Sequence, residues 1–224
     1  MKQKVEIVVK KVKKSTSLVL RCCRSDMSSK NGFVWPGVGE IATAPDWQDN
    51  NECGNGLHGW LYGQGDHSTS DFATDPDAKW LVVQVEDATI RMLGGKCKFP
   101  SGKVVFVGGK SDAADYIVEH EPKAKNVAVI GRLQSVADGG ISVGGDLATL
   151  TGGDYATLTG GDGATLTGGY RATLTGGNGA ELRFRYYDSK AERCRIKIGY
   201  VGEDGIKPNV AYRIDDKHQI VEAT

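Results

Sequence analysis

Residues 148–179 read ATLTGGDY, ATLTGGDG, ATLTGGYR and ATLTGGNG, four consecutive octads without an insertion. The octad GISVGGDL (140–147) precedes them, and AELRFRYY (180–187) continues the phase but lacks the glycines. A fixed short period indicates one small structural unit stacked on copies of itself. We therefore expect a repeat architecture in this part of the chain.

Each octad contains a strand and a turn. Ala-Thr-Leu-Thr alternates with a period of two, which puts alanine and leucine on one face and the threonines on the other. Gly-Gly-Asp-x favours a turn, because glycine adopts positive φ without strain and aspartate hydrogen-bonds to its own backbone. Two octads per coil predict a flattened β-solenoid of two sheets, with rungs about 4.8 Å apart. The leucines that would fill its interior are Leu150, Leu158, Leu166, Leu174 and Leu182.

The alternative is an antiparallel meander of four-residue strands joined by GGDx hairpins. Identical repeats favour the solenoid, because they form identical ladders that a meander does not need. The threonine rows are also similar to flat ice-binding faces, although a handful of rungs makes only a small face.

Composition and charge limit the classes of function that this chain can have. The 224 residues suffice for one large or two small domains, and 28 basic residues balance 28 acidic ones, so no overall field favours nucleic acid or membrane. No apolar run approaches the roughly 18 residues of a transmembrane helix, and the basic N-terminus lacks the apolar core of a signal peptide. Five cysteines without a CxxC motif favour reduced thiols. We expect a cytoplasmic protein without a membrane partner.

The charges are uneven along the chain. Residues 2–30 carry nine lysines and arginines against two acidic residues, whereas residues 40–88 carry ten acidic residues against Lys79 alone. We expect these segments to lie near each other and to neutralise one another. In the alternative interpretation the basic arm contacts the phosphates of a nucleic acid. The alternation of Val5, Ile7 and Val9 favours an ordinary strand instead.

The local patterns predict a mainly β fold. We expect a helix over residues 111–119, with Ser111 as its cap and Asp112 in its first turn, and an irregular segment over residues 33–65. The predicted domains are an α+β N-terminal unit (1–135), the octapeptide-repeat β-solenoid (136–187) and a β C-terminal cap (188–224). Strands are predicted at residues 4–13, 17–24, 79–85, 89–93, 103–107, 126–130, 193–200, 210–214 and 219–222.

The irregular segment concentrates the unusual residues of the chain. Long irregular segments in compact domains are usually functional or are held by aromatic packing. We consider a groove for a base, a sugar or a peptide, formed by glycine-rich turns and aromatic side chains. The residues of this candidate groove are Trp35, Trp47, Trp60, His58, Asp66 and His67.

Three other interpretations of this segment stay open. Cys53, His58 and His67, with Asp66, could bind a metal, but their spacing matches no standard zinc pattern. Cys53 and His58 could form a nucleophile–base pair, but no nucleophile motif surrounds them. The segment could also be a core loop held by its tryptophans, with His58 hydrogen-bonded inside. A deep pocket converging on His58 with a shifted pKa would indicate an enzyme, and a flat open surface a binding protein.

The motifs FVWP, APDW, CGNGLHGWLYGQGD, AKWLVVQV, GGKCKFPSGKVVFVGG and GYVGEDGIKPNVAYRID, together with the octads, resemble a family found in bacteriophages, prophages and bacterial genomes. The octads themselves resemble those of ice-nucleation proteins. The resemblance extends from about residue 32 to residue 223 and implies an intracellular phage or prophage origin. It carries no functional residue over to this chain. The N-terminal layout is also similar to ADP-ribosyltransferases, but no Glu-x-Glu follows Ser68, Thr69 and Ser70.

These observations favour an intracellular interaction protein without catalytic activity or cofactor. Its expected partner is a host protein or nucleic-acid complex, and its expected role is host-modulating or anti-defence. The alternative is an enzyme or a small-ligand-binding protein with its site in residues 35–67. Because the end coils of a short solenoid expose unpaired backbone groups, we expect the N-terminal unit to cap one end and residues 180–187 to end the stack at the other. We also predict a homodimer through the flat threonine faces or the solenoid edges.

Overall fold

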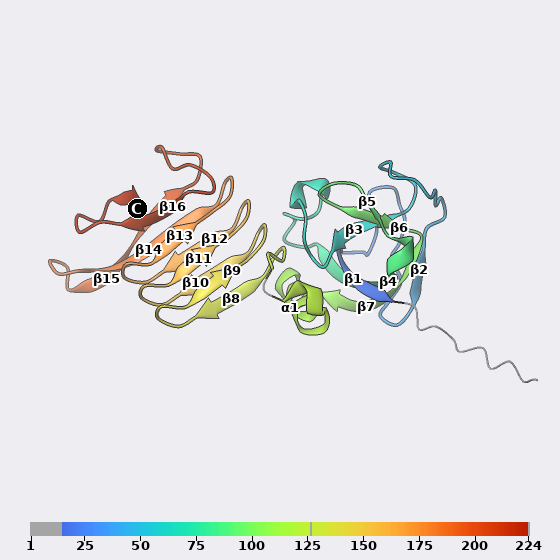
Figure 1. Ribbon diagram of the computed structural model, residues 1–224, viewed down its shortest axis with the longest axis horizontal. Helices are drawn as coiled ribbons and strands as arrows, with labels where there is room; N and C mark the ends of the chain where they lie inside the picture. The colour runs from blue at the N-terminus through green and yellow to red at the C-terminus, as the bar shows by residue number, and fades with distance from the viewer. Residues whose placement is uncertain (1–14, 126, 224) are drawn as a thin grey trace, which may run out of the picture.

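The computed structural model describes residues 15–125 and 127–223, and it consists of two lobes that lie side by side along the long axis (Figure 1). One lobe is the N-terminal α+β unit and the other is the β-solenoid, so the chain is mainly β as expected. Within the described residues, no helix is long and apolar enough to cross a membrane. The strand expected at residues 4–13 lies outside the described part of the chain.

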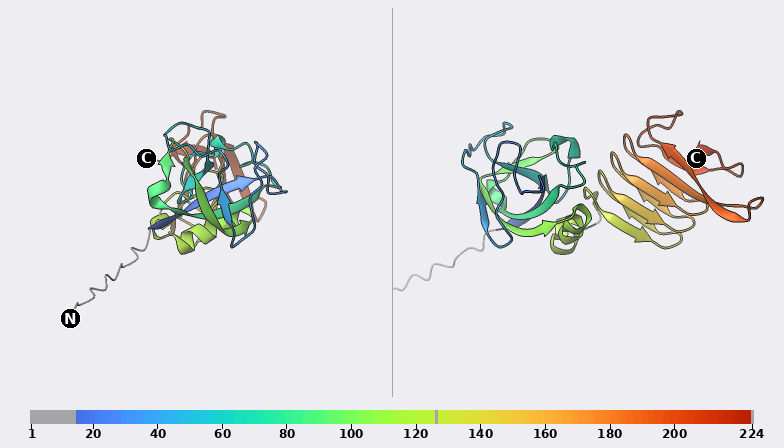
Figure 2. Two further views of the ribbon diagram at one scale, coloured as in Figure 1. Left: turned by 90° about the vertical axis from the view of Figure 1, so that its right-hand side faces the viewer. Right: turned by 180° about the vertical axis from the view of Figure 1, so that it is seen from behind.

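The N-terminal lobe is built on a curled seven-stranded sheet, in the order β2-β7-β4-β1-β3-β6-β5 (Figure 2). The two central strands β1 and β4 pair antiparallel over eight residues each, and their apolar runs are buried on both faces. The strands of this sheet are β1 (Thr16–Cys23), β2 (Ile41–Thr43), β3 (Leu57–Leu61), β4 (Lys79–Glu86), β5 (Arg91–Met92), β6 (Cys97–Phe99) and β7 (Ser101–Gly108).

One α-helix in the described residues, α1 (Lys110–His120), covers one face of this sheet. Its buried side packs Ile117 into a core with Trp60 and Trp80. Asp112 lies in the first turn as predicted, but Ser111 does not cap the helix: the N-cap is Gly109, and no side chain makes a cap hydrogen bond. Three short 3-10 helices complete the lobe: η1 (His67–Thr69), η2 (Asp87–Thr89) and η3 (Pro122–Ala124).

Several short strands differ from the sequence-based expectation. The segment expected to be irregular contains β2 and β3, and residues 94–102, where no strand was predicted, contain β6. Strand β3 includes Gly59, where a Cβ would lie 2.5 Å from the carbonyl oxygen of Leu20, so the glycine permits close pairing with β1. The strand predicted over 126–130 is absent from residues 127–130, because the backbone of Val129 and Ile130 connects the two lobes instead. The strand predicted over 89–93 shortens to β5.

The repeats form the predicted solenoid. Strands β8 (Leu133–Val136), β10 (Thr149–Gly152), β12 (Thr165–Gly168) and β14 (Glu181–Asp188) stack in one sheet, and β9 (Ile141–Val143), β11 (Thr157–Thr159) and β13 (Thr173–Thr175) stack in the other. The pairing is parallel, with Leu150 beside Leu166 and Leu158 beside Leu174, which is two octads per coil. The meander is therefore wrong. The repeat leucines are fully buried, and the threonines point outward.

The turns of the solenoid are connected by aspartates. Asp146 Oδ1 accepts a hydrogen bond from the backbone N–H of Asp162 (3.0 Å), and Asp162 Oδ1 accepts one from the N–H of Asn178 (2.7 Å). On the opposite edge Asp154 Oδ1 accepts the N–H of Tyr170 (2.8 Å). We expected these aspartates to bond within their own turns; they bond instead to the turn sixteen residues further along. Each carboxylate thus stabilises the next coil.

Structure outside the repeats packs against both ends of the repeat stack. At the C-terminal end β14 loses the glycine turn, runs straight on, and returns as the antiparallel β15 (Arg193–Tyr200). The other sheet ends with antiparallel β16 (Ala211–Ile214) and β17 (Ile220–Glu222). At the N-terminal end the α+β unit covers the first coil, where Gly145 N–H donates to the carbonyl of Val129 (2.9 Å).

Candidate functional site

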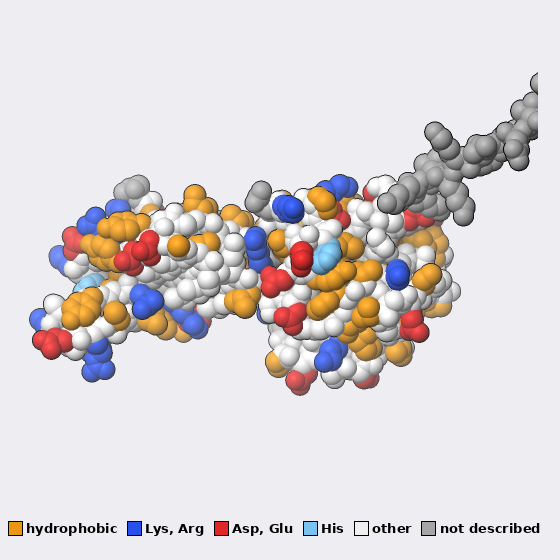
Figure 3. Space-filling model, turned by 90° about the horizontal axis from the view of Figure 1, so that it is seen from below, with side chains coloured by type: hydrophobic (Ala, Val, Ile, Leu, Met, Phe, Trp, Pro, Cys, Tyr) orange, Lys and Arg blue, Asp and Glu red, His pale blue; other side chains and the backbone are white. Residues whose placement is uncertain are grey.

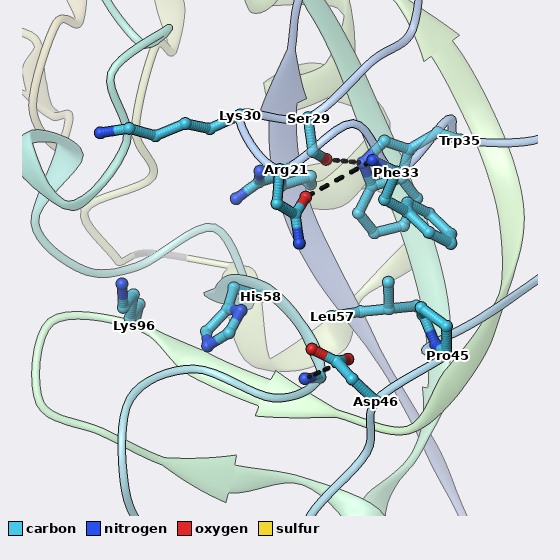
Figure 4. A pocket seen from close by; sticks show the side chains of 12 residues that line it. Arg21, Ser29, Lys30, Phe33, Trp35, Pro45, Asp46, Leu57, His58 and Lys96 are labelled. Atoms are coloured by element: carbon cyan, nitrogen blue, oxygen red, sulfur yellow. Dashed lines mark hydrogen bonds between the residues drawn. The ribbon is translucent and has the colours of Figure 1, made fainter.

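A pocket of about 290 Å³ opens in the N-terminal lobe between β1, β3 and the loops that flank β2 (Figure 4). Its lining includes Arg21, Phe33, Trp35, His58 and Lys96. These residues are far apart in the sequence, and the pairing of β1 with β3 brings them together. Two members of the candidate groove, Trp35 and His58, therefore do share one site.

The pocket walls are held by short hydrogen bonds. The indole Nε1 of Trp35 donates to Ser29 Oγ (2.9 Å), which fixes the ring against the edge of Phe33. On the opposite wall the backbone N–H of Gly56 donates to Asp46 Oδ1 (3.0 Å), just before β3 begins. Both walls are thus built from residues that the irregular segment contributes.

Two residues that line this pocket each have a buried nitrogen atom without a partner. Arg21 Nε and His58 Nε2 are buried, and neither has a hydrogen-bond partner among the described residues. Arg21 lies with its guanidinium carbon 5.9 Å from the centroid of Trp35. Unpartnered buried polar groups are rare and destabilising, so this pair is an unusual feature of the lobe.

Electrostatics give the pocket a positive character. Burial lowers the pKa of Arg21 below its ordinary value, but an arginine stays charged at neutral pH. Burial, then the nearby cations Lys96, Arg21 and Lys98, lower the pKa of His58 to about 4, so its imidazole is neutral. Among the described residues no ion pair involves Arg21 or Lys96. The pocket therefore presents two cations without an ion-pair partner, against one lining carboxylate, Asp46, which accepts the N–H of Gly56.

Lys30 also lines the pocket, but it is engaged elsewhere. Its Nζ lies 2.7 Å from Asp71 Oδ2 in an exposed ion pair. This contact is one pair between the basic segment 2–30 and the acidic segment 40–88; the lysines before residue 15 lie outside the described residues, so the wider neutralisation stays a prediction. An exposed pair of this kind contributes little to stability.

The chemistry of the pocket favours binding. A histidine whose pKa is about 4 has no proton to donate at neutral pH and is a weak base. Cys53 is exposed and does not line the pocket, so the structure gives no support to a Cys53–His58 nucleophile–base pair. The pocket does converge on His58 with a shifted pKa, which is one criterion for an enzyme, but the direction of the shift opposes general acid–base catalysis.

The remaining groove candidates lie elsewhere. Trp60 is only 2% exposed, stacks on Trp80 with centroids 5.7 Å apart, and donates from Nε1 to the carbonyl of Asp66 (2.9 Å). It is therefore a core residue, as the tryptophan-held interpretation expects. Trp47 packs beside the pocket, with the ammonium of Lys98 5.5 Å from its ring.

Asp66 and His67 lie at the junction of the two lobes. His67 Nδ1 is 3.0 Å from Asp146 Oδ2, and the backbone N–H of His67 donates to the same oxygen (3.2 Å). Donor atoms of Asp66, His67 and Asp146 all lie within 4.8 Å of one another, and this group does not include Cys53 or His58. Asp146 was not a candidate because it belongs to a repeat turn. We interpret the group as a contact between the lobes.

The sequence-based search missed Arg21 and Lys96. Arg21 interrupts the apolar run SLVLRCC of a central strand, and a charged residue in such a run is the signal that could have identified it. Lys96 lies in a glycine-rich turn, where a lysine carries no distinguishing pattern.

Comparison with known proteins finds similarity to one protein family and to several curated relatives. Residues 17–119 match a domain of unknown function (DUF7666), a span that includes the residues of the pocket. An ice nucleation protein of Pseudomonas fluorescens is 36% identical over 114 residues, and one of Xanthomonas campestris pv. translucens is 35% identical over 107 residues.

These matches cover about half of this chain but only 9% and 7% of the two relatives. No solved structure matches the chain. The chain is thus similar to a domain of unknown function over residues 17–119 and to ice nucleation proteins over about half of its length.

Proposed function

We propose that the N-terminal lobe binds a small anionic ligand with a planar ring in the pocket between Arg21 and His58. The observation that carries this proposal is that Arg21 and His58, which line one cavity together with Lys96, each have a buried nitrogen (Nε and Nε2) without a hydrogen-bond partner. A phosphate or carboxylate would accept a charge-assisted hydrogen bond from Arg21. Phe33, which is half-buried and packs against the buried Trp35, offers aromatic surface to a ring.

The size of the pocket limits the ligand. Its volume of about 290 Å³ is at the small end of ligand sites, which typically measure about 300–1,000 Å³. A mononucleotide or another phosphorylated small molecule suits this volume better than a polymer. Because His58 is a poor general base and the pocket lacks a nucleophilic cysteine, we propose binding without turnover.

The wider role proposed here is that of a phage- or prophage-encoded interaction protein in the host cytoplasm, with a host protein as its partner. The sequence resemblance and the repeat architecture support it. The two relatives described above are named ice nucleation proteins, and this chain covers less than a tenth of the length of each. Three coils offer only a small threonine face, so we do not extend that activity to this chain.

Calorimetric titration with adenosine monophosphate, inorganic phosphate and uncharged adenosine tests the ligand class. We expect the nucleotide to bind more tightly than phosphate, and adenosine to bind weakest, with the affinity falling as salt increases. Lys96→Met should weaken nucleotide binding about fivefold or more, whereas Lys103→Met, on the exposed face of β7, should leave it unchanged.

Equal affinities for adenosine and the nucleotide would refute the anion site, as would an unaffected Lys96→Met variant. Mass spectrometry of the recovered nucleotide separates binding from catalysis, because a chemically altered nucleotide would favour the enzyme alternative.

A further inference from the structure

The strand β15 forms an open outer edge of the solenoid, at the end away from the N-terminal lobe (Figure 1). It is eight residues long. The other edge strands in the described part of the chain (β2, β5, β8, β9 and β17) have only two to four residues each. A long unpaired edge is a template for the addition of another strand.

The free backbone groups of β15 follow from its pairing with β14. The two strands are antiparallel, and the ladder continues to a hydrogen bond from Val201 N–H to the carbonyl of Ala180 (2.9 Å). Residues of an antiparallel strand alternate between bonding to the neighbour and pointing away from it. The residues whose N–H and C=O groups point to the open edge are therefore Cys194, Ile196 and Ile198.

The side chains of β15 alternate between two chemical classes. Ile196 and Ile198 lie on the outer face of the sheet and are 52% and 42% exposed. The opposite face carries Arg193, Arg195 and Lys197, of which Arg195 pairs with Asp188 (2.7 Å). Basic, acidic and hydrophobic side chains all gather at this far end of the solenoid in the space-filling view (Figure 3).

We propose that the edge of β15 binds an extended segment of a partner protein in which acidic and apolar residues alternate. The segment adds one strand to the sheet and bonds to the free backbone groups around Ile196 and Ile198. Its apolar side chains lie beside these isoleucines, and its acidic side chains lie beside Arg193 and Lys197.

A second copy of this chain fits the same edge less well. Two copies of β15 could pair antiparallel about a two-fold axis. The registers that pair the most residues are those centred on Ile196 and on Lys197. The first register places Arg195 opposite Lys197, and the second places Lys197 opposite itself. Directly opposed like charges destabilise a sheet. Charge therefore favours an acidic partner strand over a homodimer at this edge.

Fluorescence anisotropy with a labelled eight-residue peptide of alternating glutamate and valine tests the proposal on the full chain. The control peptide replaces each glutamate by lysine, and we expect it to bind at least about tenfold more weakly. Ile198→Pro removes an N–H that points to the open edge, so it should weaken binding about tenfold or more without breaking the ladder to β14. Ile198→Ala keeps the N–H and should have a smaller effect.

A second form of the probe does not depend on a folded variant. N-methylation of alternate peptide amides on the bonding side should also weaken binding about tenfold, because it blocks the donors that meet β15. Lys197→Glu should reduce the preference for the glutamate peptide. Equal binding of the two peptides, or of the methylated and unmethylated forms, would overturn the proposal. A uridine oligonucleotide that competes and is insensitive to Ile198→Pro would indicate a phosphate-binding surface instead.

Discussion

Replacing Arg21 by methionine should stabilise the ligand-free protein. Leaving a buried polar group unpartnered typically costs about 1–3 kcal/mol, and methionine removes that group with little change in volume. The variant loses the contact of Arg21 with Trp35, which is worth about 0.5–1 kcal/mol. The net gain should be about 0.5–2 kcal/mol, or a rise of about 2–6 °C in the melting temperature of a chain of this length.

Thermal unfolding followed by circular dichroism measures this effect, and calorimetry on the same samples measures nucleotide binding. The matched control is Arg24→Met, because Arg24 donates from Nη1 to the carbonyl of Ser29 (2.8 Å) and its loss should reduce stability. We expect the Arg21 variant to be more stable and unable to bind the anion. A clear loss of stability in Arg21→Met would refute the reasoning, since it would show that the guanidinium is well satisfied in the free protein.

Four further predictions follow from the structure. Leu158→Ala should destabilise the solenoid by about 2–5 kcal/mol in chemical denaturation, because Leu158 is fully buried. Thr157→Ser should cost far less, because Thr157 is exposed. Equal losses of stability would contradict this orientation. The pKa of His58 lies below its ordinary value, so the unfolded chain binds more protons than the folded chain as the pH drops from 6.5 to about 4. The free energy of unfolding should therefore fall over this range by roughly 1–2 kcal/mol, after allowance for the partial exposure of the ring. His58→Gln should flatten that decline. Asp162→Ala should cost about 1 kcal/mol, because it leaves the N–H of Asn178 without its acceptor, and Asp162→Asn should restore part of it. Sedimentation at micromolar concentration tests the homodimer through the threonine faces; a constant mass near 23.9 kDa would exclude it.

The solenoid could be predicted because the strand pattern and the turn residues of each octad indicate the same structure. The alternation that buries Leu150 also exposes the neighbouring threonines, and the same turn chemistry recurs at each corner. The bonds from each aspartate to the next coil could not be predicted, because they join residues sixteen apart that meet only after stacking. Strands β3 and β6 were missed because they have five and three residues and lie among glycines.

The pocket could be predicted only in part. Trp35 and His58 were identified because they are unusual residues in an irregular segment. Arg21 comes from a different strand, and its proximity to them depends on long-range pairing that a local pattern does not contain. The separation of Trp60 from Trp35 has the same origin, because the sheet places the two side chains in different cores.

The aspartate bonds between coils make sixteen residues the natural unit in which this protein can change its length. Insertion of one full coil repeats every contact, including the hydrogen bond from a backbone N–H of one turn to the aspartate carboxylate of the turn before it. It moves the far end of the solenoid outward by about 4.8 Å. Insertion of a single octad would instead exchange the two sheets for all later residues, and it would move β14 and β15 to the opposite side of the molecule. The distance between the pocket and the open edge strand can therefore be adjusted in discrete steps, while the chemistry at either end stays the same.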